Sequence, residues 1–140
     1  MENLKQIKIY SRAELLKMEP LQLHKYLIEN FSIEIPLDLD SIEAMNKATT
    51  LISIATSYYS FLESMRVEAN IQKTIFKESA ALVEEPDTKK AYQQEYQNML
   101  KREQIFESMT KITDRKYQGV SRMITIKQQV TKEIEMYKRG

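Results

Sequence analysis

The sequence predicts an all-α protein, and three features of its 140 residues point to that fold. Only 2 glycines and 3 prolines are present, fewer turn-forming residues than a β-rich chain of this length needs. Apolar residues recur at helical spacing along most of the chain. Hydrophobic residues make up 42% and charged residues 29%, so enough apolar material is present to build a core. We expect an elongated hairpin of two long helices with shorter N- and C-terminal helices, assembling into a homo-oligomer.

The first forty residues predict a helical segment followed by a linker. Leucine and tyrosine side chains at helical spacing indicate a helix over residues 11–30, which Pro20 is expected to interrupt. Residues 31–40 alternate between apolar and polar types, as a strand does. Pro36 and the short length nevertheless favour an extended linker over a strand.

A long helix is expected over residues 41–82, which contain neither proline nor glycine. Asp40 and Glu43 have the spacing of a capping box, with Ser41 as the alternative cap. Such a helix would be about 60 Å long, whereas a compact chain of this size has a radius of gyration of about 14 Å. Residues 51–65 are apolar on more than one side, so we expect part of their cover to come from another subunit.

A third long helix is expected after the break at residues 84–87, with Asp87 or Thr88 as its cap. Gly119 weakens this helix and is expected to mark a bend or a stop. Residues 1–140 are therefore expected to form a single helical domain. Its parts are the N-terminal helical segment and linker over 1–40, the helical hairpin over 41–118, and a basic C-terminal helix over 119–140 that serves oligomerisation.

The residue types that carry most enzyme chemistry are scarce. The chain has no cysteine and one histidine, His24, which lies between Leu23 and Lys25 on a short helix. Two glycines cannot form a phosphate-binding loop. Two carboxylate clusters have a simpler role at helix N-termini than as metal ligands; they are Asp38, Asp40 and Glu43, and Glu84, Glu85 and Asp87. We expect no enzymatic activity, no cofactor and no metal.

The sequence gives no sign of a membrane or secreted protein. The N-terminus lacks the plan of a secretion signal, and no apolar run approaches the roughly 20 residues that span a bilayer. We expect a cytoplasmic protein that does not bind membranes. Positive charge is concentrated in residues 111–140, which hold eight Lys or Arg against three Asp or Glu. This indicates an acidic partner, although basic residues in last turns also suit the helix dipole.

Two sets of basic residues are candidates for contacts with a phosphate backbone. The first lies on one face of the long helix and consists of Arg66, Lys73 and Lys77; subunits side by side would join these residues into a track. The second consists of Arg115, Lys116, Arg122 and Lys127. Exposed tyrosines would stack on unpaired bases, but most of the eight lie on apolar stripes that core or subunit contacts also explain. A plain solvated face is the alternative for the second set.

Three stretches carry a resemblance to a known family: Glu19-Pro20-Leu21-Gln22, Met65-Arg66-Val67-Glu68-Ala69, and residues 120–127, Val-Ser-Arg-Met-Ile-Thr-Ile-Lys. They resemble phage recombination mediators of the UvsY type. The family has a basic residue, an apolar residue and Glu-Ala, followed by further basic residues, and Lys73 and Lys77 fit that pattern. Near the end it has Ser-Arg, apolar residues and Lys, which Ser121, Arg122, Ile126 and Lys127 match. Glu78 stands where the family has a basic residue, so the resemblance does not fix the path of DNA.

The resemblance implies a ring-like homo-oligomer that binds single-stranded DNA. Such proteins help a RecA-type recombinase to replace single-strand-binding protein, so both would be partners. In this chain Arg66, Lys73 and Lys77 would contact phosphates. The subunit interface would be built by Met123, Ile126, Val130, Ile134 and Tyr137. Two other functions stay open, a virion assembly or scaffold component and a small phage inhibitor that docks on a host protein.

Overall fold

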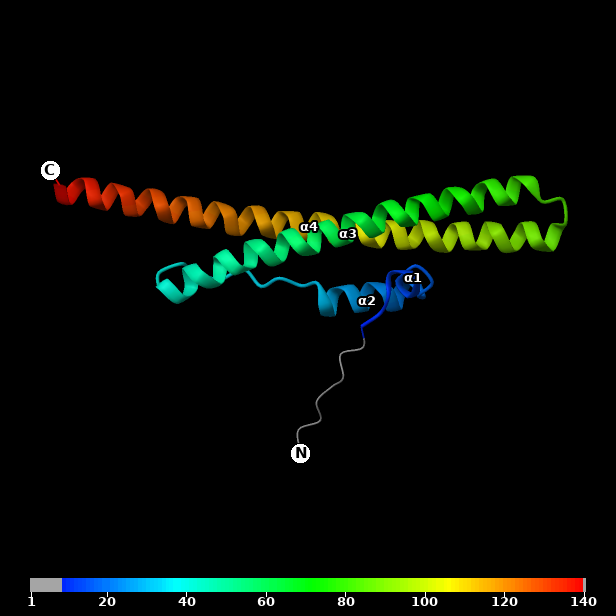
Figure 1. Ribbon diagram of the computed structural model, residues 1–140, viewed down its shortest axis with the longest axis horizontal. Helices are drawn as coiled ribbons and strands as arrows, with labels where there is room; N and C mark the ends of the chain where they lie inside the picture. Colours follow the sequence, from blue (N-terminus) through cyan, green and yellow to red (C-terminus); the bar gives the residue numbers. More distant parts are fainter. Residues whose placement is uncertain (1–8, 140) are drawn as a thin grey trace, which may run out of the picture.

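The computed structural model describes residues 9–139, and every regular element in that range is a helix. The helices are α1 (Arg12–Leu15), α2 (Pro20–Asn30), α3 (Ile42–Leu82) and α4 (Pro86–Arg139). α3 and α4 run side by side in opposite directions, and α1 and α2 lie against their middle (Figure 1). The predicted all-α class is confirmed, as is the interruption at Pro20, where α2 begins. In residues 9–139, no helix combines the length and the apolar character that crossing a membrane requires.

The start of α3 lies within one residue of its predicted position. Ser41 is the cap, because its side chain accepts a hydrogen bond from the amide of Ala44 at 3.0 Å. The alternative cap named from the sequence is therefore the one used, rather than the Asp40–Glu43 capping box. Asp40 is left free for a contact with α4, which is described below.

The cap of α4 differs from the prediction. The carboxylate of Glu85 accepts hydrogen bonds from the amides of Asp87, at 3.1 Å, and Thr88, at 2.7 Å. Glu85 is therefore the cap, and the prediction that Asp87 or Thr88 caps this helix was wrong. Pro86 occupies the first helical position, where its missing N–H and fixed φ are well suited.

The expected separate C-terminal helix over residues 119–140 was also wrong, because α4 is unbroken from Pro86 to Arg139. The helix does not stop at Gly119. A glycine inside a helix costs about 1 kcal/mol relative to alanine. The next residue, Val120, is buried against Leu39 and Ala48, and burying a valine is worth about 1.5–3 kcal/mol. Packing therefore outweighs the low helix propensity of this one residue.

The main core lies where α1 and α2 pack against the middle of the hairpin. Phe106 has no exposed surface there, and Leu23 and Leu27 of α2 are equally buried. The buried residues of α4 recur with the alternating spacing of three and four that a coiled-coil seam shows. Members of this seam are Met99, Arg102, Phe106, Met109, Thr113 and Val120.

The N-terminal segment supplies the second neighbour that residues 51–65 require. Phe31 stacks on Phe61, with ring centroids 5.2 Å apart, and meets the edge of Tyr58 at 4.9 Å. The guanidinium of Arg12 lies 5.7 Å from the ring centroid of Phe61. Part of the cover that was expected from another subunit therefore comes from the same chain.

The segment between α2 and α3 is extended, as predicted, and anchors a second, smaller core. Ile33 and Leu39 are buried although both neighbouring stretches are exposed. Leu39 packs with Ala48 of α3 and Val120 of α4. The linker thus packs against both long helices at the end of the hairpin away from the turn, which α1 and α2 do not reach (Figure 1).

α4 is longer than α3, with 54 residues against 41, and its C-terminal end projects beyond the start of α3 (Figure 1). Lys127 Nζ lies 3.4 Å from Asp40 Oδ1, just before α3 begins. Residues 128–139, which we call the overhang, therefore have no α3 beside them and measure about 18 Å at 1.5 Å per residue. Every residue of the overhang is exposed.

Candidate nucleic-acid interface

Two of the three basic residues predicted on α3 are bound to carboxylates of the same chain. The guanidinium of Arg66 donates two hydrogen bonds to Glu63, from Nε at 3.0 Å and Nη2 at 2.6 Å. Lys73 Nζ lies 2.7 Å from Oε2 of Glu103 on α4, an ion pair without the alignment of a hydrogen bond. The Lys73 and Glu103 side chains are only 18% and 14% exposed. A phosphate would have to displace these carboxylates.

The titration behaviour of both carboxylates fits firm pairing. The hydrogen bonds from Arg66 lower the pKa of Glu63, against a smaller opposing effect of burial. Burial acting alone would raise the pKa of Glu103. Contact with Lys73, a hydrogen bond from Asn70 at 3.1 Å and the positive charges of Lys73 and Arg66 together hold that pKa below its ordinary value. Both side chains therefore stay ionised at neutral pH and keep their basic partners neutralised.

Replacing Glu103 by glutamine is expected to weaken the pH dependence of stability in acid. Because the pKa of Glu103 is lowered by folding, its stabilising effect is present above its unfolded pKa and disappears as pH falls through the folded one. The wild-type protein should lose stability below about pH 5, and Glu103→Gln should lose less over that range while being less stable at neutral pH. Urea unfolding followed by circular dichroism across a pH series measures this.

Glu78→Gln removes one exposed negative charge from α3 and serves as the control. Parallel stability-versus-pH curves for wild type and Glu103→Gln would contradict the role assigned to this ion pair.

The third predicted residue on α3, Lys77, lies in a different environment. It lines a groove of about 520 Å³ between α3 and α4, close to the turn that joins them. From α4 come Lys89, Gln93 and Tyr96, and Lys77 and Lys89 are both exposed. We call this the turn groove. It places two ammonium groups, an amide and a half-exposed phenol ring along one opening, which suits a phosphate backbone and unpaired bases.

Lys89 and Tyr96 were not among the predicted site residues. Lys77 and Lys89 are close only because the connection at residues 83–85 folds α4 back along α3. Once the position of that turn is known, residues equally far from it on the two helices face each other. The signal was thus present in the sequence, but it depended on the pairing of the two helices.

The predicted residues on α4 divide in the same way. Arg115 and Arg122 are exposed, and because α4 continues through Gly119 they share one helix face. Lys116 is half-buried, and Lys127 is paired with Asp40. Among the residues that the structure describes, no carboxylate pairs with Lys77, Arg115 or Arg122. These three are the predicted positions whose charge is available to a partner.

The turn groove and the exposed arginines are far apart within one chain. Lys89 and Arg115 are 26 residues apart on α4, about 39 Å at 1.5 Å per residue. A single chain therefore carries two separate basic surfaces rather than one track.

The five predicted interface residues also separate into two groups. Met123 is partly buried against the second core of the chain itself. The other four are exposed, with Ile126 at 53%, Val130 at 43%, Ile134 at 52% and Tyr137 at 90%. Val130, Ile134 and Tyr137 continue the spacing of the buried α4 seam into the overhang. From Val130 to Tyr137 the seam thus runs on for about two turns with no other helix of residues 9–139 beside it (Figure 1).

The chain was compared with family models, with curated proteins and with solved structures, and nothing in any of the three matches it.

Proposed function

We propose that this protein is a non-enzymatic, single-stranded-DNA-binding recombination mediator that acts as a homo-oligomer. The observation that carries the proposal is the turn groove, which Lys77, Lys89 and Tyr96 line together. Ammonium groups bind the phosphate backbone of DNA of any sequence, while an aromatic ring stacks only on bases that are not already paired. This combination favours single strands over duplex.

Self-assembly through the overhang is the second part of the proposal. An exposed apolar stripe on a helix that already supports a coiled-coil seam suits the same stripe on another copy. The overhang also carries Lys132, Lys138 and Arg139. A second copy that packs on the apolar stripe would leave these charges in solvent. Assembly multiplies weak basic sites, and sites held at high local concentration bind a long strand far more tightly than one site does.

The mediator role itself comes from the resemblance of residues 19–22, 65–69 and 120–127 to UvsY-type proteins. By that resemblance the partners are a RecA-type recombinase and single-strand-binding protein, and the protein would hold DNA in a form the recombinase can occupy. In the structure Arg66 and Lys73 are paired with carboxylates, so we place the first phosphate contacts at Lys77, Lys89, Arg115 and Arg122 instead.

Fluorescence anisotropy of a labelled oligonucleotide, single-stranded against duplex, tests the proposal across a salt series. Tight binding of the single strand with a steep loss of affinity in salt is the expected result. Lys77→Ala combined with Lys89→Ala should lower the slope of log affinity against log salt by about 1.4, since each phosphate contact to a single strand contributes about 0.7. Oligomeric mass should not change.

Lys25→Ala, which removes an exposed lysine of α2 away from the groove, is the control and should bind as wild type does. No binding at low salt would contradict the proposal and leave an assembly component or an inhibitor of a host protein. Equal affinity for duplex would contradict the preference for single strands and the stacking of bases on Tyr96 that is proposed to cause it.

A further inference from the structure

Arg102 is the one buried charged residue of the described chain. It belongs to the buried seam of α4 and is only 5% exposed. Its Nε donates a hydrogen bond to the backbone carbonyl of Met18 at 2.7 Å, which ties α4 to the turn between α1 and α2. Its Nη1 is buried and has no hydrogen-bond partner among residues 9–139. A buried guanidinium with an open donor is costly unless something supplies an acceptor.

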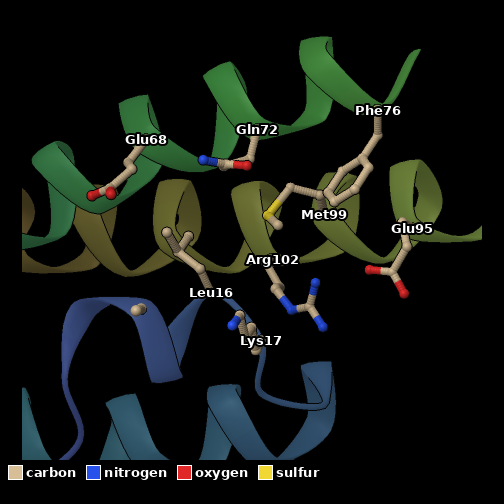
Figure 2. A pocket seen from close by; sticks show the side chains of 9 residues that line it. Leu16, Lys17, Glu68, Gln72, Phe76, Glu95, Met99 and Arg102 are labelled. Carbon is tan, nitrogen blue, oxygen red and sulfur yellow. The ribbon is translucent and has the colours of Figure 1, made fainter. Parts of the chain in front are cut away.

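A cavity of about 470 Å³ opens beside this guanidinium, between α1, α3 and α4. Figure 2 shows Leu16, Phe76 and Met99 lining it, with the guanidinium of Arg102 directed away from α3 and toward the N-terminal segment, drawn in blue. Small-ligand sites have this size and this combination of apolar walls with a few polar groups. We call this space the Arg102 pocket.

The charges around the Arg102 pocket favour an anion. Glu68, one of its two carboxylates, is already paired with Arg12 at 3.1 Å. Glu95 is the other, and it forms no ion pair with Arg102 in the described chain, although its charge acts on the guanidinium. Lys17 and Arg102 together therefore outweigh Glu95, and the pocket has one positive charge in excess.

A second cavity, of about 710 Å³, adjoins the first and shares Lys17, Glu95 and Arg102 with it. It adds Asn98 and Lys101 of α4, and it also includes Glu19. The carboxylate of Glu19 accepts hydrogen bonds from the amides of Leu21 and Gln22 at the start of α2, and its negative charge also acts on Arg102. Lys101 offsets this charge, so the space next to the Arg102 pocket is polar, and at about 710 Å³ it is larger than the pocket itself.

We propose that the Arg102 pocket binds the carboxyl-terminal end of a partner polypeptide whose last residue is apolar. The α-carboxylate would accept hydrogen bonds from Arg102 Nη1 and Lys17, and a guanidinium is the side chain best shaped for a carboxylate. The last side chain would pack on Leu16, Phe76 and Met99. The preceding residues would cross the second cavity, where Asn98 and Lys101 suit peptide groups and an acidic side chain.

This site is separate from the turn groove. The two share no lining residue, although Glu95 of the Arg102 pocket and Tyr96 of the turn groove are neighbours on α4. The variants that test them change different side chains. Peptide binding and DNA binding can therefore fail independently, and either result leaves the other proposal standing.

The test uses a fluorescein-labelled peptide, Ser-Gly-Asp-Gly-Leu, with a free carboxyl end, titrated with the full-length protein. The same peptide with an amidated end should bind at least about tenfold more weakly, because it lacks the negative charge that pairs with Arg102 and Lys17. A peptide ending in Ser instead of Leu should also bind more weakly. Chemical shift changes in the Met99 methyl of the wild-type protein should accompany binding of the first peptide only.

Two variants test the contributions of Arg102 and Lys17 to peptide binding. Arg102→Lys keeps the positive charge but loses Nη1, and Lys17→Ala removes an exposed ammonium without touching the core. Both should weaken the free-acid peptide by about tenfold and leave the amidated one unchanged. Equal binding of acid and amide, no binding of either, or full affinity in the Lys17→Ala protein would overturn the proposal, and none of these readings depends on the Arg102 variant folding.

Discussion

Replacing Phe106 by alanine is expected to lower the free energy of unfolding by about 3–5 kcal/mol. Phe106 has no exposed surface and is the largest of the fully buried side chains. It lies in the main core, where α1 and α2 pack on the hairpin, so its loss leaves a cavity between three elements. Small domains have about 5–15 kcal/mol of stability in total, and this change removes a large part of it. Urea unfolding followed by circular dichroism gives the value.

Ile71→Ala provides the matched control for the truncation. Ile71 is an aliphatic residue in the middle of α3, and it is 53% exposed. Its replacement should change the free energy of unfolding by no more than about 0.5 kcal/mol. Similar values for the two variants would mean that the main core does not lie where the structure places it.

Replacing Ile126 and Ile134 together by aspartate is expected to dissociate the oligomer while leaving the fold intact. Both residues are about half-exposed in the single chain, so a charge there costs little in the monomer. In an interface built on the overhang and the turn of α4 just before it, the two carboxylates would be buried without partners. The concentration needed for assembly should rise at least about hundredfold, and single-strand affinity should fall with it. Sedimentation velocity over a range of concentrations measures the mass.

Gln128→Asp combined with Gln129→Asp adds the same charge to the polar side of the overhang and is expected to keep the wild-type mass. A wild-type protein that sediments as a monomer at high concentration would reject the assembly part of the proposal. Loss of mass in both double variants would point to net charge, rather than the apolar stripe, as the cause.

The long helices were predictable because local signals fix them. The run of residues without proline or glycine and the cap at Ser41 placed α3 within one residue of its observed bounds. Gly119 gave the opposite result, because a propensity of about 1 kcal/mol is a weak signal beside the burial of Val120. The cap of α4 was displaced by two or three residues because a carboxylate before a proline competes with Asp and Thr after it.

The candidate sites depended on features that periodicity does not carry. Whether Lys73 is free or paired depends on the register of α3 against α4, which brings Glu103 to it from 30 positions along the chain. The Arg102 pocket exists only because α1 and α2 dock on the hairpin, through contacts such as Arg102 with Met18 across 84 positions. Such contacts follow from the packing of whole elements, so a sequence pattern in one helix cannot reveal them.

The short connection at residues 83–85 has a consequence for the order in which the chain folds. Contacts near that turn close small loops, whereas the contact of Lys127 with Asp40 closes one of 87 residues. The hairpin should therefore grow outward from the turn, at the microsecond to millisecond rates of helical proteins with local contacts. α1 and α2 dock on the hairpin through contacts such as Arg102 with Met18, which also closes a long loop of 84 residues. They should therefore join late and open early, so their amide protons should exchange before those in the centre of α4.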